Sequence, residues 1–195
     1  MPWLSDDYYR FFWDAAIMDS GFSPYAFSPR QFLILAEEIE GLNGIFPLLN
    51  SPDYYSIYLP VNQYMHWLAF KVGGEDLNGF VIALRAFYAI VLLSAFLLFQ
   101  RFSSHAVQKN YPLFFANPLL WIEGLGNLHV EIFLASSLII AAVFYAQHRA
   151  KSGVAFLIGL FTKLSSFPMV LAAFIFARKM KTLFYLAAGA LVFLV

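Results

Sequence analysis

The sequence has no cysteine, and only 12% of its 195 residues are charged. Without cysteine, disulfide bonds and thiolate chemistry are excluded. A water-soluble domain usually carries about 25% charged residues, so this chain has half the charge needed to face water on all sides. Hydrophobic residues make up 61% of the chain and include 23 phenylalanines. The composition therefore predicts a protein whose main solvent is a lipid bilayer.

Motifs for nucleotide binding and for common hydrolytic chemistry are absent as well. There is no Walker loop, no glycine-rich dinucleotide motif, no zinc-protease helix and no Gly-x-Ser-x-Gly elbow. The first residues also lack the basic and apolar regions of a signal peptide. The missing phosphate-binding loops disfavour a nucleotide substrate.

The few charges are divided unequally along the chain. Residues 1–80 carry ten acidic and three basic side chains and residues 81–195 carry two and nine, so the net charges are −7 and +7. These blocks argue against nucleic acid as a partner. Because basic loops are retained in the cytoplasm, the acidic region is predicted to lie outside. The pattern is typical of a multi-pass protein of the cytoplasmic (inner) membrane.

The predicted fold class is an all-α integral membrane protein. Its extracytoplasmic loop region covers residues 1–79, with an interfacial helix at about 5–19 and a partly membrane-dipping segment at about 56–72. Its transmembrane region covers residues 80–195, with segments at about 80–99, 111–123, 129–147, 153–176 and 183–195. The last is an uncharged run of thirteen residues, fewer than the roughly 20 that a span needs, so we expect a truncated span and a fragment.

The segment 153–176 is predicted to be a re-entrant hairpin. It has the length of one span, but basic residues flank it on both sides, which places both ends in the cytoplasm. Lys163 and Pro168 divide it into two short pieces. Such broken backbone is tolerated only where protein or a water-filled cavity surrounds it, so Lys163 is expected at a functional depth.

A first polar cluster lies in the predicted interfacial helix. Asp7, Arg10 and Asp14 fall at i, i+3 and i+7, and Asp6 lies four residues before Arg10. Helix geometry therefore brackets the guanidinium with carboxylates on one face. A surface salt-bridge ladder is one interpretation, and a carboxylate base beside a cation is the other.

A second group of polar and aromatic residues follows in the same region. Tyr25 belongs to a loop marked by Gly21, Pro24 and Pro29, and Tyr58 and Gln63 lead into an aromatic segment. Tyr58 and Gln63 could hydrogen-bond a sugar, whereas the aromatic side chains of the Tyr25 loop can anchor at the interface. A belt of tyrosines at the membrane interface is the alternative.

A third cluster interrupts apolar sequence in the second half of the chain. Glu123 and Glu131 flank His129, and helix breakers surround them. A carboxylate within a span costs roughly 2.5 kcal/mol or more unless it is paired or hydrated, so an internal polar site is expected. A divalent metal ion is left open, although the spacing matches no metal signature. Arg85, inside its own span, could instead snorkel outward.

Taken in chain order, these clusters resemble the multi-spanning GT-C glycosyltransferases, especially bacterial polyprenyl-phosphate-mannose-dependent mannosyltransferases. The first outer loop of that family carries an acidic pair, Tyr-Arg-Tyr, Trp-Asp, Gly-x-x-Pro-Tyr and a later Pro. The matching residues are Asp6, Asp7, Tyr9, Arg10, Phe11, Trp13, Asp14, Gly21, Pro24, Tyr25 and Pro29.

Later motifs continue the resemblance. The family's Ser-x-Tyr-Pro-Pro and Gln resemble Ser56, Tyr58, Leu59, Pro60 and Gln63, and its Lys before a Pro resembles Lys163 and Pro168. Its Asn-Pro-Leu, Glu and Asn-Gly-His-x-Asp resemble Asn117, Pro118, Leu119, Glu123, Asn127, His129 and Glu131. Leu59 for Pro, Leu128 for Gly and Glu131 for Asp depart from the pattern and leave the sugar open.

The resemblance implies a GT-C-like bundle, of which the chain covers roughly the N-terminal half and is expected to be inactive alone. It implies transfer of a hexose, with mannose as the family's choice, from a polyprenyl-phosphate donor to an extracytoplasmic lipid or glycan acceptor with inversion. The partners would be donor, acceptor and membrane lipids, with no nucleic acid and no firmly predicted cofactor.

The resemblance also implies roles for individual residues. Asp7, or else Asp6, would be the catalytic base. The implied cations for the leaving phosphate are Arg10, His129 and Lys163, with Arg85 as a weaker candidate. The acidic residues Asp14, Glu123 and Glu131 would orient these cations or bind sugar hydroxyls, and Tyr25, Tyr58 and Gln63 would shape the pocket. This assignment requires the first-loop helix to lie close to His129 and Lys163.

Two other functions fit the residues without the resemblance. Broken helices and intramembrane charges also occur in secondary transporters, although no paired repeat is present here. A non-catalytic membrane assembly subunit, with the acidic loop as its docking surface, is the third interpretation.

Overall fold

The computed structural model describes residues 2, 4–35, 42–103, 108–109, 111–145 and 148–163. These residues form helices, and no β-strand occurs among them beyond one isolated antiparallel bridge between Tyr58 and Lys163. The all-helical part of the predicted fold class is therefore confirmed for the described chain.

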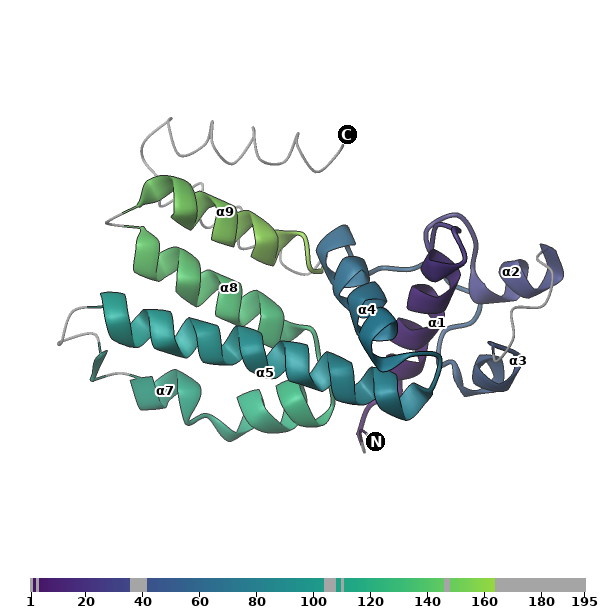
Figure 1. Cartoon of the computed structure of the whole chain (residues 1–195), viewed down its shortest axis with the longest axis horizontal. Coiled ribbons are helices and arrows are strands. Elements are labelled where there is room, and N and C mark those ends of the chain that lie inside the picture. The colour runs from purple at the N-terminus through teal and green to yellow at the C-terminus, as the bar shows by residue number, and fades with distance from the viewer. Residues whose placement is uncertain are drawn as a thin grey trace.

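Two groups of helices are arranged along one long helix, α5 (Leu77–Phe102). Figure 1 shows the N-terminal helices gathered at the start of α5 and the later helices running beside the rest of it. The first group is α1 (Asp7–Asp19), α2 (Pro29–Leu35), α3 (Leu42–Ile45), the 3-10 turn η1 (Phe46–Leu48) and α4 (Pro60–Gly73). The second group is α7 (Tyr111–Phe115), the π-helical η2 (Leu120–Gly126), α8 (Glu131–Phe144) and α9 (Arg149–Leu160).

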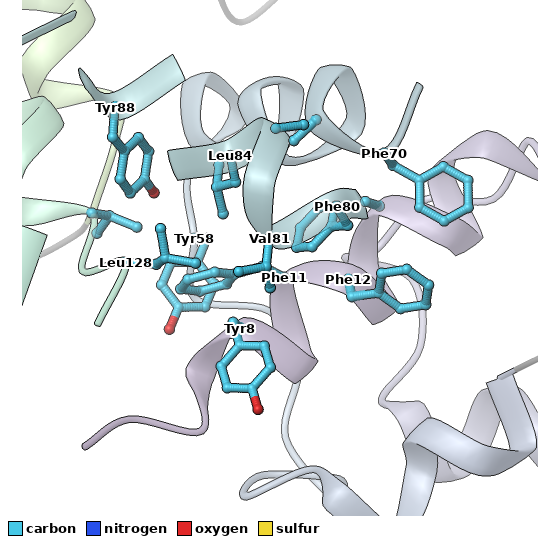
Figure 2. Packing of buried hydrophobic residues seen from close by; sticks show 14 of the residues in the cluster. Tyr8, Phe11, Phe12, Tyr58, Phe70, Phe80, Val81, Leu84, Tyr88 and Leu128 are labelled. Atoms are coloured by element: carbon cyan, nitrogen blue, oxygen red, sulfur yellow. The ribbon is translucent and has the colours of Figure 1, made fainter. Parts of the chain in front are cut away.

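Helix α1 is enclosed by its neighbours and does not lie exposed as a surface helix. Phe11, Phe12 and Trp13 are all buried, and Phe12 packs edge-on against Phe70 of α4 and Phe80 of α5 (Figure 2). Aromatic side chains point to several sides of this helix, so contact along one face would leave much of its apolar surface uncovered. Packing against α4 and α5 buries this apolar surface and so avoids the free-energy cost of leaving it in water.

Helix α4 covers the larger part of the segment expected to dip into the membrane. It starts at Pro60, whose fixed φ and missing N–H suit the first helical position. It ends at Gly73, followed by Gly74 with a φ of 77°, which is the left-handed region that glycine enters at little cost. Residues before Pro60 are extended, and Tyr58 lies in that part.

One helix in the described chain is long and apolar enough to cross a membrane. This is α5, with 26 residues, and the span expected at 80–99 lies within it. At about 1.5 Å per residue α5 is about 39 Å long, more than the hydrocarbon thickness of a bilayer. Helices η2 and α8 are together long and apolar enough for a second span. The chain bends by 119° between them, as in a broken span or a re-entrant loop.

The later segments differ in detail from the expected ones. The segment expected at 111–123 is divided at Asn117-Pro118 into α7 and η2, since a proline disrupts the hydrogen bonds of a continuous helix. Helix α9 runs antiparallel to α8 and returns to the level where α8 begins (Figure 1). Residues 164–176 of the predicted hairpin and the predicted span 183–195 lie outside the described residues.

Helices α4 and α5 touch through two glycines, and we expect alanine at one of them to destabilise the fold. A Cβ added at Gly79 would overlap the carbonyl oxygen of Gly73, which is backbone and has no room to move. Overpacking of this kind costs about 1–3 kcal/mol. Thermal unfolding in detergent should show a lower midpoint for Gly79→Ala. Gly44→Ala is the matched control, because its Cβ would meet nothing within 4 Å; equal midpoints for both variants would contradict the close packing.

Candidate active site

The predicted cluster on α1 is centred on a buried ion pair. Nε of Arg10 donates to Oδ1 of Asp14 at 2.8 Å, and the two side chains are only 4% and 1% exposed. The surface-ladder interpretation of this spacing is therefore wrong for Arg10 and Asp14. A buried pair of this kind is stable only when its other polar atoms are also satisfied.

Most of those atoms are satisfied by bonds that join α1 to the loop before α4 and to α4 itself, although the buried Nη2 of Arg10 has no hydrogen-bond partner among the described residues. Nη1 of Arg10 donates to the carbonyl oxygens of Ser51 at 3.1 Å and Tyr54 at 3.0 Å. Nε2 of Gln63 donates to Oδ2 of Asp14 at 2.7 Å. Burial raises the pKa of Asp14, while the Arg10 charge and the hydrogen bonds from Gln63 and Ser56 oppose that rise. The pair therefore holds the loop against both helices.

Asp7 lies at the start of the same helix and faces a pocket. Nδ2 of Asn50 donates to Oδ1 of Asp7 at 2.9 Å, which fixes the orientation of the carboxylate. The pocket has a volume of about 460 Å³. Its lining consists of Asp7, Arg10, Asn50, Ser51, Tyr54, Tyr55, Ser56, Ile57, Tyr58 and Lys163.

Lys163, which follows the C-terminal end of α9, also lines this pocket. The bridge to Tyr58 is extended by hydrogen bonds from Leu59 N to Thr162 O and from Val61 N to Phe161 O, both at 3.2 Å. Nζ of Lys163 donates to Oε1 of Glu131 at 2.6 Å. Asp7 and Lys163 therefore line one pocket, which is the arrangement that the predicted base requires.

Glu131 and Lys163 belong to a chain of polar contacts. His129 lies between the two glutamates, with Nδ1 at 4.0 Å from Oε2 of Glu131 and Nε2 at 3.9 Å from Oε2 of Glu123. Nδ2 of Asn127 donates to the same oxygen of Glu123 at 3.1 Å. The third predicted cluster is thus one connected group, and Lys163 joins it to the pocket.

The backbone that presents His129 is unusual. Leu128 has a φ of 61°, a left-handed conformation that favours glycine and costs a branched residue roughly 1–2 kcal/mol. The fully buried Leu128 side chain offsets this cost in the apolar core (Figure 2). Glycine would adopt this conformation without strain, and burial of the Leu128 side chain is what allows leucine to adopt it.

Arg85 supports this turn from α5 and does not line the pocket. Its Nε donates to the carbonyl oxygen of Leu125 at 2.8 Å, and its Nη2 donates to that of Gly126 at 3.2 Å. These carbonyls lie at the end of η2, where a helix leaves acceptors unsatisfied. Arg85 is thus directed at protein backbone and does not simply snorkel away.

Other predicted residues lie beside the pocket or away from it. Asp6 is exposed at the start of α1, and only Asp7 of the acidic pair lines the pocket. Tyr25 donates from its hydroxyl to the carbonyl oxygen of Tyr58 at 2.7 Å and so supports the pocket wall. Gln63 acts in the same indirect way, through Asp14 and Ser56.

Six lining residues were not part of the predicted site: Asn50, Ser51, Tyr54, Tyr55, Ser56 and Ile57. They come from a loop that the sequence marks only by Pro52 and by a tyrosine pair typical of a membrane interface. Their place in the pocket follows from the Arg10 contacts, which no local pattern reveals. Among the described residues, no three histidine, aspartate or glutamate side chains are grouped as metal ligands would be.

A comparison with family models identifies the wider group. The model for alpha-(1->6)-mannopyranosyltransferases, N-terminal domain, matches residues 1–194. The chain belongs to this family. The match confirms the resemblance to mannosyltransferases. Curated proteins and solved structures contain no significant match.

The Arg10–Asp14 pair should be essential for the stability of this mannosyltransferase-family domain. Breaking a buried ion pair by removing one partner costs about 3–5 kcal/mol, because the remaining charge is left unpaired. We therefore expect Asp14→Ala to lower the thermal midpoint strongly and to expose residues 50–58 to proteolysis. Asp53→Ala is the matched control, because Asp53 and Arg30 form an exposed pair and their loss should change little. Similar midpoints for the two variants would contradict a structural role for Arg10–Asp14.

Arg85 should act by holding the turn that carries His129. We expect Arg85→Met, which keeps the stem and removes the donors, to reduce the rate of mannosyl transfer by up to about 100-fold, the effect of roughly 1 Å of displacement at a site. Initial rates would be compared with those of Arg101→Met, at the opposite end of α5. Unchanged transfer by Arg85→Met would rule out this positioning.

Proposed function

We propose that the protein acts as a membrane glycosyltransferase, which moves a mannosyl group from a polyprenyl-phosphate donor to an acceptor hydroxyl with inversion. The observation that carries this proposal is the shared pocket, where the Asp7 carboxylate lies in one lining with Arg10 and Lys163. A base and cations around one cavity are what such a transfer needs.

The distribution of basic residues supports a membrane orientation. Arg101 ends α5 and Lys151 lies at the start of α9, at the end of the helices remote from the pocket. Basic connectors are retained in the cytoplasm, so the pocket would face the extracytoplasmic side of the inner membrane. Helix α5 has the length for one span of the proposed GT-C-like bundle.

The proposed reaction is a single displacement at the anomeric carbon. Asp7 takes the proton of the acceptor hydroxyl as the oxygen bonds to the anomeric carbon, and the bond from that carbon to the phosphate oxygen breaks. Among the described residues, Oδ2 of Asp7 has no hydrogen-bond partner, so it is the oxygen that would receive the proton. The polyprenyl phosphate leaves with the bonding electrons.

Cations are needed where the phosphate gains charge. Lys163 lines the pocket directly, and Glu131 orients its ammonium group. His129 lies next to Glu131 and would act at the same end. Arg10 is held by Asp14 and two carbonyls, so it supplies a fixed positive charge near Asp7 without moving.

The family name supports an α-linked product and a sugar as the acceptor. An alpha-(1->6) product implies that the attacking group is the 6-hydroxyl of a sugar. With inversion, an α product requires a β-linked donor. Family membership also favours the enzyme over the transporter and assembly-subunit interpretations.

Transfer by membranes that contain the full-length protein tests this function. With polyprenyl-phosphate-linked radiolabelled mannose and a cell-envelope extract, wild type should label a new acceptor. Asp7→Asn should lose about 10²- to 10⁴-fold in rate, because it removes the base. Glu75→Gln, an exposed acid between α4 and α5, is the control and should keep its rate.

Other outcomes would change the assignment. Loss of transfer in Asp6→Asn with an active Asp7→Asn would move the base to Asp6. Absence of transfer from any polyprenyl-phosphate sugar in wild type would contradict the proposed function and favour transport or docking.

A further inference from the structure

We propose that Tyr54 and Tyr55 form the subsite that binds the acceptor sugar, with Asn50 between them and Asp7. This inference rests on the proposed function and names the surface that the acceptor, a neutral pyranose, would occupy. It concerns residues that the family motifs do not include.

The first observation is the exposure of two adjacent aromatic side chains at a polar pocket. Tyr54 is 71% exposed and Tyr55 is 52% exposed, and both line the pocket. Tyr58, the other tyrosine of the lining, is buried in the core. The negative face of an aromatic ring attracts the weakly positive C–H groups on one side of a pyranose. Exposed rings at a pocket rim therefore suit a sugar.

The second observation is that the loop is held in place. Arg10 bonds the carbonyls of Ser51 and Tyr54, and Arg30 N donates to the carbonyl of Pro52 at 3.0 Å. A platform fixed before binding loses little conformational freedom when the ligand arrives. The loop is thus preorganised by hydrogen bonds to its backbone, which leave the two tyrosine rings exposed.

The third observation concerns charge. Asp53 is the only charged residue in the segment 50–58, and it is paired with Arg30. Arg10 lies beside this segment, but it is buried and already bonded to Asp14 and to the carbonyls of Ser51 and Tyr54, whereas Lys163, next to Tyr58, is 26% exposed. A phosphate would be drawn to Lys163, whereas the Tyr54–Tyr55 side offers no cation of its own segment. We therefore assign the donor phosphate to the Lys163 side of the pocket and the acceptor sugar to the Tyr54–Tyr55 side.

Asn50 connects the platform to the base. It begins the same segment, and its side-chain amide donates to Asp7 at 2.9 Å. A pyranose on the two rings would lie beside this pair and could present its 6-hydroxyl to Asp7. The subsite thus accounts for both binding and direction of the acceptor.

The test compares acceptor and donor kinetics of the full-length protein, with a mannose oligosaccharide that has a free 6-hydroxyl as the acceptor probe. Tyr54→Ala and Tyr55→Ala should each raise the acceptor KM by about threefold to tenfold. The donor KM and slow donor hydrolysis by water should not change. Tyr54→Phe and Tyr55→Phe should restore the acceptor KM, since they keep the ring face. Tyr64→Ala is the control, because Tyr64 is 60% exposed on α4 and does not line the pocket.

Several outcomes would overturn the subsite while leaving the proposed function intact. An unchanged acceptor KM in both alanine variants would do so, as would an equal rise of donor and acceptor KM, which indicates anchoring in the membrane interface. Calorimetric titration of the oligosaccharide into purified protein gives an independent readout. Wild type should bind, and the alanine variants should bind more weakly; no binding to wild type, or equal binding by all, overturns the subsite. Absence of transfer by wild type speaks against the proposed function separately.

Discussion

The buried ion pair between Arg10 and Asp14 is the interaction on which the candidate site depends. It lies on one helix, but its remaining hydrogen bonds reach the loop before α4 and Gln63 within α4. Because charges removed from water must be paired, these partners cannot be released without a large cost. The pair thus fixes the loop that lines the pocket, and Asp7, one turn earlier on α1, is presented toward it.

A second junction brings distant sequence to that loop. The end of α9 pairs with the segment that contains Tyr58, and Lys163 contacts Glu131 at the start of α8. Arg85 from α5 holds the end of η2, from which the chain turns to His129. Two separate polar clusters in the sequence therefore become one candidate site, with Asp7, the proposed base, on α1 and Lys163 just after the end of α9.

Much of the helical content follows from local sequence, and several features of the site do not. The apolar run around residues 80–99 is visible in the sequence because it depends on composition. The segment expected at 111–123 was wrong in its continuity, because it ran through Asn117-Pro118, where the structure divides it. The spacing of Arg10 and Asp14 predicts their contact, but an exposed and a buried pair have the same spacing. Asn50, Tyr54 and Tyr55 have no motif, since their role depends on contacts with α1.

The sequence by itself determined the helical class, the apolar long helix, the mannosyltransferase resemblance and the chemical types gathered in the site. These depend on composition, on periodicity along a single helix and on motifs read in order. Tertiary structure decided that α1 is buried, that Arg85 bonds backbone carbonyls, and that Asp7 and Lys163 line the same pocket. Such features require groups far apart in the sequence to meet, 40 residues for Arg85 and Leu125 and more than a hundred for Asp7 and Lys163, and only the packing of α1, α4, α5, α8 and α9 specifies which groups do so.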